Sequence, residues 1–185
     1  MALQTATKLT YDDWVNLPDD GKHYELIDGE LYLNPSPNTK HQRVLLNLLA
    51  ALHRHVTESN VGEVFVSPFD VVLSNVDVFE PDILFIRAER IDIVTKANVQ
   101  GAPDIVIEVL SESTRRKDET KKLDRYERSG VSEYWIVDPM EDAVRILRLS
   151  GARYERIIVG GAITSPLLPG FSLALKDVFA ERRAG

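Results

Sequence analysis

Apolar and polar residues alternate with two different periods along the chain, so the pattern predicts both strands and helices. Residues 22–34 contain two runs rich in Leu, Ile and Tyr around Asp28-Gly29, a dipeptide typical of a tight turn, and they predict a β-hairpin. A helix is expected next, because Ser36-Pro37 suits an N-cap and a first helical position. Its apolar positions have helical spacing: Val44, Leu45, Leu48, Leu49, Leu52 and Val56.

Three later stretches are rich in Val, Ile and Phe and predict central strands near 63–73, 76–87 and 103–110. A highly charged segment, 117–129, then predicts a short helix. Gly130 follows it, and glycine commonly ends a helix because it readily adopts a positive φ.

The C-terminal part returns to strand-like patterns. Residues 133–137 predict a strand, and 143–149 and 153–159 alternate as an antiparallel pair. A last helix is expected at about 175–183. The order of elements predicts an α/β (α+β) fold, in which helices flank a mixed central sheet, with an N-terminal hairpin and extra C-terminal strands.

The length and composition favour one domain over residues 1–185, with its core at about 8–180. A chain of 185 residues is within the usual size of one domain, and 44% hydrophobic residues suffice for a core. No apolar run approaches the roughly 18 residues of a membrane helix, and residues 1–5 lack the start of a signal peptide. A cytoplasmic protein with no membrane partner is therefore expected.

The charge and the residue types limit the chemistry. The chain has no cysteine, so any metal must bind to oxygen or imidazole ligands. The net charge of -7 argues against a nucleic-acid partner, yet seven Lys and Arg residues crowd the segment 115–128. Acidic residues are interleaved with them, so a solvated helix face is an equally good interpretation.

Acidic residues on apolar strands are the main candidates for chemistry, because a buried carboxylate needs a partner or a metal. Asp104 and Glu108 would be about 13 Å apart on one strand, too far to share an ion, so Asp104 is expected to be structural. Asp82 and Glu108 can lie on neighbouring strands about 4.8 Å apart. Their oxygens, with the backbone carbonyl of Val109, could bind Mg²⁺ or Mn²⁺.

A lysine beside such a metal would stabilise the charge that develops during phosphoryl transfer. Lys122 is the candidate, because the charged helix begins just beyond the strand that carries Glu108. The alternative is an ordinary i,i+4 ion pair between Lys122 and Asp118 on the helix surface.

Several segments together resemble the Uma-type restriction endonuclease family, formerly a domain of unknown function, of the PD-(D/E)XK nuclease superfamily. The resemblance covers about residues 8–180. It rests on Tyr24-Glu-Leu-Ile-Asp-Gly-Glu30, His41 opening a helix, Pro81-Asp82-Ile, Ile107-Glu108-Val-Leu-Ser111, Asp118-x3-Lys122-x3-Tyr126 and Gly130-Val-Ser-Glu-Tyr-Trp-Ile-Val-Asp138-Pro139.

The resemblance implies a restriction-endonuclease-like fold and Mg²⁺-dependent hydrolysis of phosphodiester bonds, with Asp82 and Glu108 as the two acids. The lysine that the superfamily places two residues after the second acid is Leu110 here. Related proteins move this lysine to the following helix, where Lys122 matches. Glu25 matches the additional acid of many members, although Glu30 on the paired strand competes for that role.

Two further residues have open interpretations. His41 matches a position near the site, but it also lies on the apolar face of its helix and can be a packing residue. Tyr126 lies four residues beyond Lys122 and could orient it, or it could anchor its helix in the core.

The sequence therefore predicts a metal-dependent endodeoxyribonuclease with Glu25, Asp82, Glu108 and Lys122 in its active site. A homodimer would present one site to each strand of DNA. The alternative, motivated by Leu110 and the acidic charge, is a catalytically inactive binding or assembly module with a nuclease fold. A glycosidase would also use two acids, but the two tryptophans provide few platforms for sugar rings.

Overall fold

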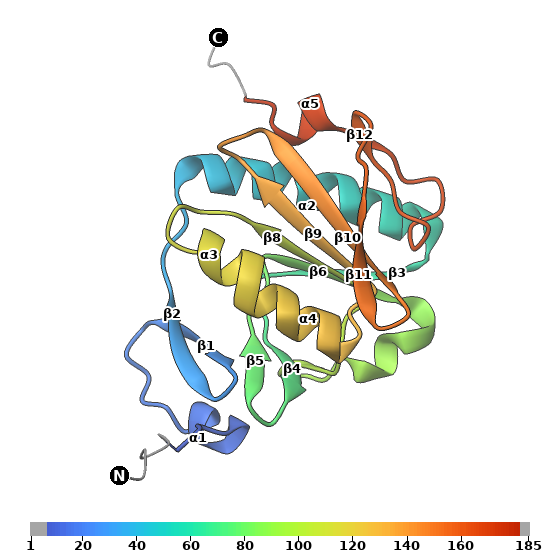
Figure 1. Cartoon of the computed structure of the whole chain (residues 1–185). Coiled ribbons are helices and arrows are strands. Elements are labelled where there is room, and N and C mark those ends of the chain that lie inside the picture. The colour runs from blue at the N-terminus through green and yellow to red at the C-terminus, as the bar shows by residue number, and fades with distance from the viewer. Residues whose placement is uncertain (1–6, 182–185) are drawn as a thin grey trace.

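Two β-sheets and the helices around them form the protein, in a computed structural model that describes residues 7–181 (Figure 1). The larger sheet has six strands in the order β11-β10-β9-β8-β6-β3, and the smaller has five in the order β2-β1-β5-β4-β7. The larger sheet is mixed, because β8 runs parallel to β9 and antiparallel to β6. The predicted α/β architecture is confirmed, whereas the sequence did not predict the smaller, five-stranded sheet.

The strands of the larger sheet are β3 (Gly62–Val66), β6 (Ile83–Arg87), β8 (Ile105–Val109), β9 (Glu133–Asp138), β10 (Ala143–Ser150) and β11 (Arg153–Ile157). The smaller sheet contains β1 (His23–Ile27), β2 (Glu30–Asn34), β4 (Val71–Ser74), β5 (Asp77–Phe79) and β7 (Val99–Gln100). A separate pair is formed by β12 (Ala162–Ile163) and β13 (Leu173–Ala174). The helices are α1 (Tyr11–Val15), α2 (Thr39–Ser59), a 3-10 helix (Ala88–Ile93), α3 (Arg115–Lys117), a π-helical turn (Asp118–Lys122), α4 (Leu123–Ser129) and α5 (Leu175–Val178).

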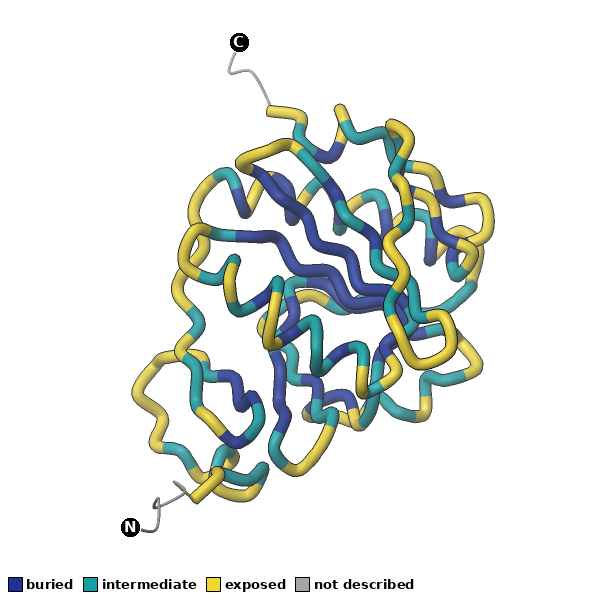
Figure 2. Tube along the Cα trace, viewed as in Figure 1, coloured by how far each residue is buried: buried dark blue, intermediate teal, exposed yellow. Residues whose placement is uncertain are grey.

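Helices α2 and α4 lie on opposite sides of the larger sheet (Figure 1). The apolar face of α2 packs on the face of the larger sheet that is turned away from α4. Leu48 and Leu52 join Phe85 and Trp135 there in one core. Alternate residues of the same strands face α4 and the smaller sheet, and Tyr126 belongs to this second core. Figure 2 shows that the central strands are buried along most of their length.

The hairpin is confirmed, and its turn has the backbone that Asp-Gly favours, with φ of 53° at Asp28 and 75° at Gly29. The predicted start of α2 is wrong. The helix begins at Thr39 and not near Ser36-Pro37, because the Asn38 side chain accepts a hydrogen bond from the His41 backbone N–H at 2.9 Å.

Two of the predicted strands are each divided between the sheets. The segment 63–73 contains β3 and β4, separated at Ser67-Pro68, and 76–87 contains β5 and β6, separated at Pro81. Proline has no backbone N–H for a strand ladder, so each proline marks the place where the chain leaves one sheet for the other. The pattern of apolar residues alone ran across these breaks.

The other expected elements are present with shifted ends. The charged helix begins at Arg115 rather than residue 117, contains the π turn, and ends at Gly130, where φ is 83°. The C-terminal pair is confirmed as β10 and β11. The last helix spans only Leu175–Val178, and residues 182 and 183 of the expected helix, like residues 1–5, lie outside the described range.

Within residues 7–181, no helix combines the length and the apolar composition that are needed to cross a membrane.

Strand β3 approaches β6 so closely at Gly62 that no side chain fits between them. Strand β6 is the one that follows Asp82. A Cβ at this position would lie 2.1 Å from the Ile86 carbonyl oxygen. We expect Gly62→Ala to lower the free energy of unfolding by about 1–3 kcal/mol, because the strands must separate to admit the methyl group. Urea denaturation measures this, with Gly160→Ala as the control, since a Cβ there meets no atom within 4 Å. Equal midpoints for the two variants would contradict the prediction.

Candidate active site

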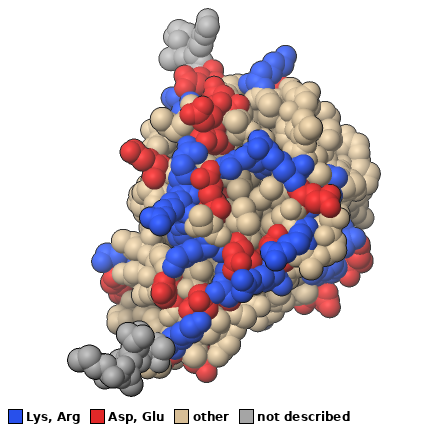
Figure 3. Space-filling view, viewed as in Figure 1, with Lys and Arg blue, Asp and Glu red and all other residues tan. Residues whose placement is uncertain are grey.

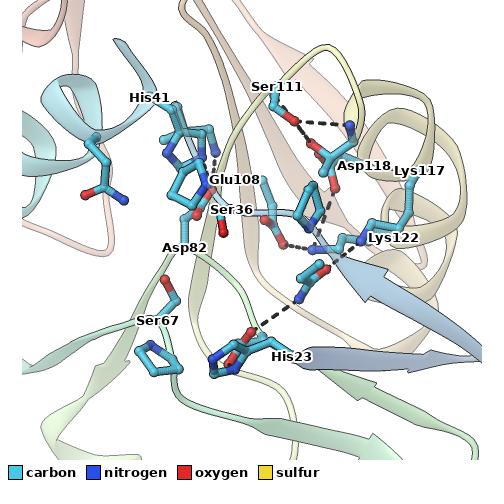
Figure 4. Close-up of a pocket in the computed structure, with 18 residues that line it drawn as sticks. His23, Ser36, His41, Ser67, Asp82, Glu108, Ser111, Lys117, Asp118 and Lys122 are labelled. Carbon is cyan, nitrogen blue, oxygen red and sulfur yellow. Dashed lines mark hydrogen bonds and ion pairs between the residues drawn. The ribbon is translucent and has the colours of Figure 1, made fainter. Parts of the chain in front are cut away.

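A cavity of about 370 Å³ opens where the start of α2, the ends of β2 and β8 and the π turn converge (Figure 4). Its walls carry side chains from segments that are far apart in the sequence. The ionisable residues that line it include His41, Asp82, Glu108, Lys117, Asp118 and Lys122. The backbone of Val109 also lines it, whereas Glu25 lies directly behind its surface.

Asp82 immediately precedes β6 and Glu108 lies on the adjacent strand β8, so the two acids are neighbours, as the strand spacing predicts. The pairing of Ile83 with Ile107 between β6 and β8 places the next residues, Asp82 and Glu108, opposite each other. The Asp82 carboxylate accepts a hydrogen bond from the Val109 backbone N–H at 2.7 Å. Both side chains line the same cavity, so they can act on one ligand.

Asp104 lies at the other end of β8 and outside the cavity. Its carboxylate forms ion pairs with Arg87 at 2.8 Å and Arg90 at 2.9 Å. These partners hold the pKa of Asp104 below its usual value although burial opposes this. The residue is structural, as predicted.

The ammonium of Lys122 bridges two carboxylates inside the protein. It lies 2.7 Å from Glu25 Oε1 and 2.7 Å from Glu108 Oε1, and 3.6 Å from Asp118 Oδ1. Burial alone would disfavour the charged amine, but Glu108 and Glu25 outweigh it and hold the pKa of Lys122 well above its usual value. The helical ion pair with Asp118 therefore exists, but the two shorter contacts dominate.

Glu25 is fully buried and binds two lysines at once. Its Oε2 accepts a hydrogen bond from Lys117 at 2.6 Å, and its Oε1 accepts one from the Glu80 backbone N–H at 3.0 Å besides contacting Lys122. Burial opposes ionisation, but the two ammonium groups hold the pKa of Glu25 below its usual value. The competing acid, Glu30, is exposed and pairs with Lys121.

The π turn explains why two lysines reach Glu25. Residues five apart in an α-helix project about 140° apart, so Lys117 and Lys122 would point in different directions. The π turn over Asp118–Lys122 has a wider repeat that brings positions five apart to one side. Sequence reasoning missed Lys117, because an α-helical pattern gives no signal for this arrangement.

Tyr126 has one of the two roles that the sequence left open, that of a core anchor, and its hydroxyl contacts a different residue from the expected Lys122. Its ring is fully buried, with centroids 5.0 Å from those of Phe79 and Tyr134. Its hydroxyl donates a hydrogen bond to Glu108 Oε1 at 2.9 Å, so the contact is with the acid and not with Lys122. Tyr126 thus anchors the helix and orients Glu108.

His41 faces the site from α2. Its Nε2 lies 3.3 Å from Asp82 Oδ2, and among the described residues Nδ1 has no hydrogen-bond partner. Burial opposes the protonated ring, but the hydrogen bond and charge of Asp82 outweigh it and raise the pKa of His41. The histidine is therefore a packed residue that also contacts the carboxylate.

The buried charges do not balance. The carboxylates of Glu25, Asp82, Glu108 and Asp118 face two lysines, and His41 adds a charge only when protonated. Burial raises the pKa of Glu108 well above its usual value and also raises that of Asp118, whose Oδ1 has no hydrogen bond within the described range. A divalent cation would compensate this excess of negative charge.

The ligand set for such a cation is small. In the part of the chain that the structure describes, no three His, Cys, Asp or Glu side chains are arranged around one metal position. The residues that fit are the carboxylates of Asp82 and Glu108, with backbone oxygen from Val109, and hard cations such as Mg²⁺ prefer oxygen ligands. Water or substrate oxygens would complete the coordination.

The basic residues outside the cavity are mostly paired. Figure 3 shows Lys and Arg side chains in an arc over the face that carries α4, with Asp and Glu between them. Arg115 pairs with Asp138 at 2.6 Å, Arg148 with Glu133 at 2.7 Å and Arg153 with Glu127 at 2.9 Å. The interleaved acids therefore neutralise much of this surface.

Removing Glu25 would leave the buried Lys122 and the half-buried Lys117 without their shared counter-ion. We expect Glu25→Ala to lower the free energy of unfolding by about 3–5 kcal/mol, the usual cost of an uncompensated buried charge. Urea denaturation measures the loss. Glu30→Ala is the matched control on the paired strand, and it should change stability very little because Glu30 is exposed. Similar losses in the two variants would refute the network.

Comparisons with known proteins agree with this architecture. Residues 10–176 match the Uma2 family, described as "Putative restriction endonuclease". The crystal structure of "a putative nuclease belonging to DUF820" from Anabaena variabilis has a TM-score of 0.78 and 22% identity, over 92% of this chain and 97% of that chain. At this identity the likeness shows the fold. No curated protein matches the chain. The resemblance found in the sequence is confirmed, and the chain belongs to the Uma2 family.

Proposed function

We propose that the protein is a metal-dependent endonuclease that hydrolyses phosphodiester bonds in DNA. The observation that supports this most directly is the meeting of Asp82, Glu108 and two lysines at one cavity. Membership of a family described as restriction endonucleases, and a structural relative described as a nuclease, support the same reaction class.

Asp82, Glu108 and the Val109 carbonyl would hold Mg²⁺ or Mn²⁺. A cation bound there would polarise the phosphoryl oxygen and lower the pKa of a bound water. Tyr126 and Lys122 keep the Glu108 carboxylate oriented, and His41 does the same for Asp82.

The two lysines have different roles in this proposal. A lysine ammonium has three N–H donors. Lys122 contacts Glu25 and Glu108 at 2.7 Å each and is almost fully buried, so Lys122 is a positioning residue. Lys117 binds Glu25 and Asn34 at 2.6 and 2.8 Å, which leaves one N–H for the cavity that it lines.

Lys117 therefore takes the phosphate-binding role that the sequence assigned to Lys122. During hydrolysis a water oxygen bonds to phosphorus while the bond to the leaving sugar oxygen breaks. Negative charge develops on the phosphoryl oxygens, and an ammonium beside them stabilises it. DNA as the nucleic acid and a homodimer as the active form stay predictions.

Cleavage of supercoiled plasmid tests the activity. The wild-type protein should nick the plasmid with Mg²⁺ or Mn²⁺, and Asp82→Asn should slow nicking by about 100-fold or more. Asp82 makes no contact with either lysine, so this variant should stay folded, which circular dichroism can verify. Asp92→Asn, an exposed residue of the 3-10 helix, is the control. The proposal fails if no divalent metal supports nicking, or if Asp82→Asn cuts as fast as the control.

Metal binding distinguishes the enzyme from an inactive module with the same fold. A cation that binds only the folded protein must stabilise it, by about 2.7 kcal/mol at a concentration 100 times its Kd. We expect Mn²⁺ to raise the Tm of the wild-type protein and of Glu89→Gln, an exposed control. The rise should disappear in Glu108→Gln, each variant being compared with its own metal-free Tm. If Mn²⁺ does not change the wild-type Tm, the result would favour the inactive binding or assembly module.

A further inference from the structure

A second groove, of about 300 Å³, adjoins the candidate active site on the side of α1 and β1. His23, Pro68 and Glu80 line both the groove and the cavity, so the two hollows share a wall. Figure 4 shows His23 at the edge of the cavity, beyond Asp82 and Lys122. A substrate seated in the cavity can therefore extend into the groove.

Hydrogen bonds connect the shared wall to Lys117. Glu80 Oε1 lies 3.0 Å from His23 Nδ1, and Glu80 Oε2 accepts a hydrogen bond from Asn34 at 3.3 Å. The same Asn34 side chain accepts a hydrogen bond from Lys117 at 2.8 Å. The groove is thus held in a fixed position relative to the lysine that would bind phosphate.

The groove has flat apolar walls that are fixed in place. Trp14, Pro68 and Phe69 line it. The Trp14 indole N–H donates to the Tyr24 carbonyl at 3.0 Å, and the Phe69 ring stacks on Phe65 with centroids 5.0 Å apart. Preorganised aromatic walls of this kind suit a planar ring, because stacking then costs little ordering.

Asp70 is a half-buried acid that lines the groove, and its carboxylate makes no hydrogen bond or ion pair with the other described residues. Burial first, and then the charge of Glu80, raise the pKa of Asp70 to about 6. The carboxylate therefore keeps its full capacity to accept hydrogen bonds from a ligand in the groove.

The charges of the groove exclude a phosphate. Asp19, Asp70 and Glu80 outnumber Lys22 along its walls, so an anion would be repelled. A ligand that fits is flat, uncharged and rich in N–H donors. The Watson–Crick edge of an unpaired guanine has this character, because two adjacent N–H donors can meet two carboxylate oxygens.

We infer that this groove binds an unpaired guanine of the nucleotide next to the scissile phosphate, stacked on Trp14 and Phe69 and hydrogen-bonded to Asp70. The inference rests on the proposed function, since it takes the cavity as the site of a phosphodiester. It makes single-stranded or locally opened nucleic acid the substrate class, because a paired base has no free Watson–Crick edge.

Binding of labelled single strands in EDTA tests this without cleavage. Fluorescence anisotropy would compare a thymine oligonucleotide carrying one central guanine with the same strand carrying an adenine there, which can stack but lacks the two adjacent N–H donors. We expect the guanine strand to bind about tenfold more tightly, the scale of one bidentate hydrogen-bonded contact to a base. Asp70→Asn should reduce this ratio to threefold or less, and the exposed control Asp92→Asn should keep it.

The outcomes separate this inference from the proposed function. Equal affinity for the two strands, an unchanged ratio in Asp70→Asn, or no binding of either strand would overturn the inference. A guanine preference that depends on Asp70 would support it even if plasmid is never cut, and in that case only the nuclease proposal would fail. Plasmid cutting with no guanine preference would support the proposed active site and overturn the proposal that the groove binds guanine.

Discussion

The ammonium of Lys122 is the interaction on which the rest of the structure depends. It contacts Glu25 from the smaller sheet and Glu108 from the larger one, and all three groups are almost completely buried. A buried charge without a partner costs several kcal/mol, so neither sheet can move away from the helix without exposing or orphaning a charge. The same ion pairs therefore determine both the packing of the two sheets and the electrostatics of the cavity.

The distribution of charge reconciles an acidic protein with a polyanionic substrate. The net charge of -7 describes the whole chain, and the basic arc over α4 is largely neutralised by neighbouring acids. In the proposed function, the positive charge that meets a phosphate is that of Lys117, which lines the cavity. Electrostatic recognition would then be confined to one position and would depend on the local field more than on a broad basic surface.

Sequence patterns were sufficient where local chemistry decides the structure. The Asp28-Gly29 turn fixed the hairpin, and strand spacing separated Asp104 from the pair of Asp82 and Glu108. The same patterns were insufficient where contacts between distant segments determine the structure. Asn38 and Ser36 are both good caps, and the apolar stretches continue across Pro68 and Pro81 although the chain changes sheet there. The role of Lys117 depends on a π turn, which an α-helical period cannot show.

The unequal attachment of the acidic residues has an evolutionary consequence. Buried ion pairs of Lys122 with Glu25 and Glu108 connect the two sheets, whereas among the described residues the Asp82 side chain contacts the Val109 backbone and His41. Under the proposed function, a descendant that had stopped cutting could lose Asp82 at little cost in stability, but it would retain the lysine and its two glutamates for the packing of the sheets. Among relatives, the aspartate would then be the informative marker of retained catalysis, and the lysine would not.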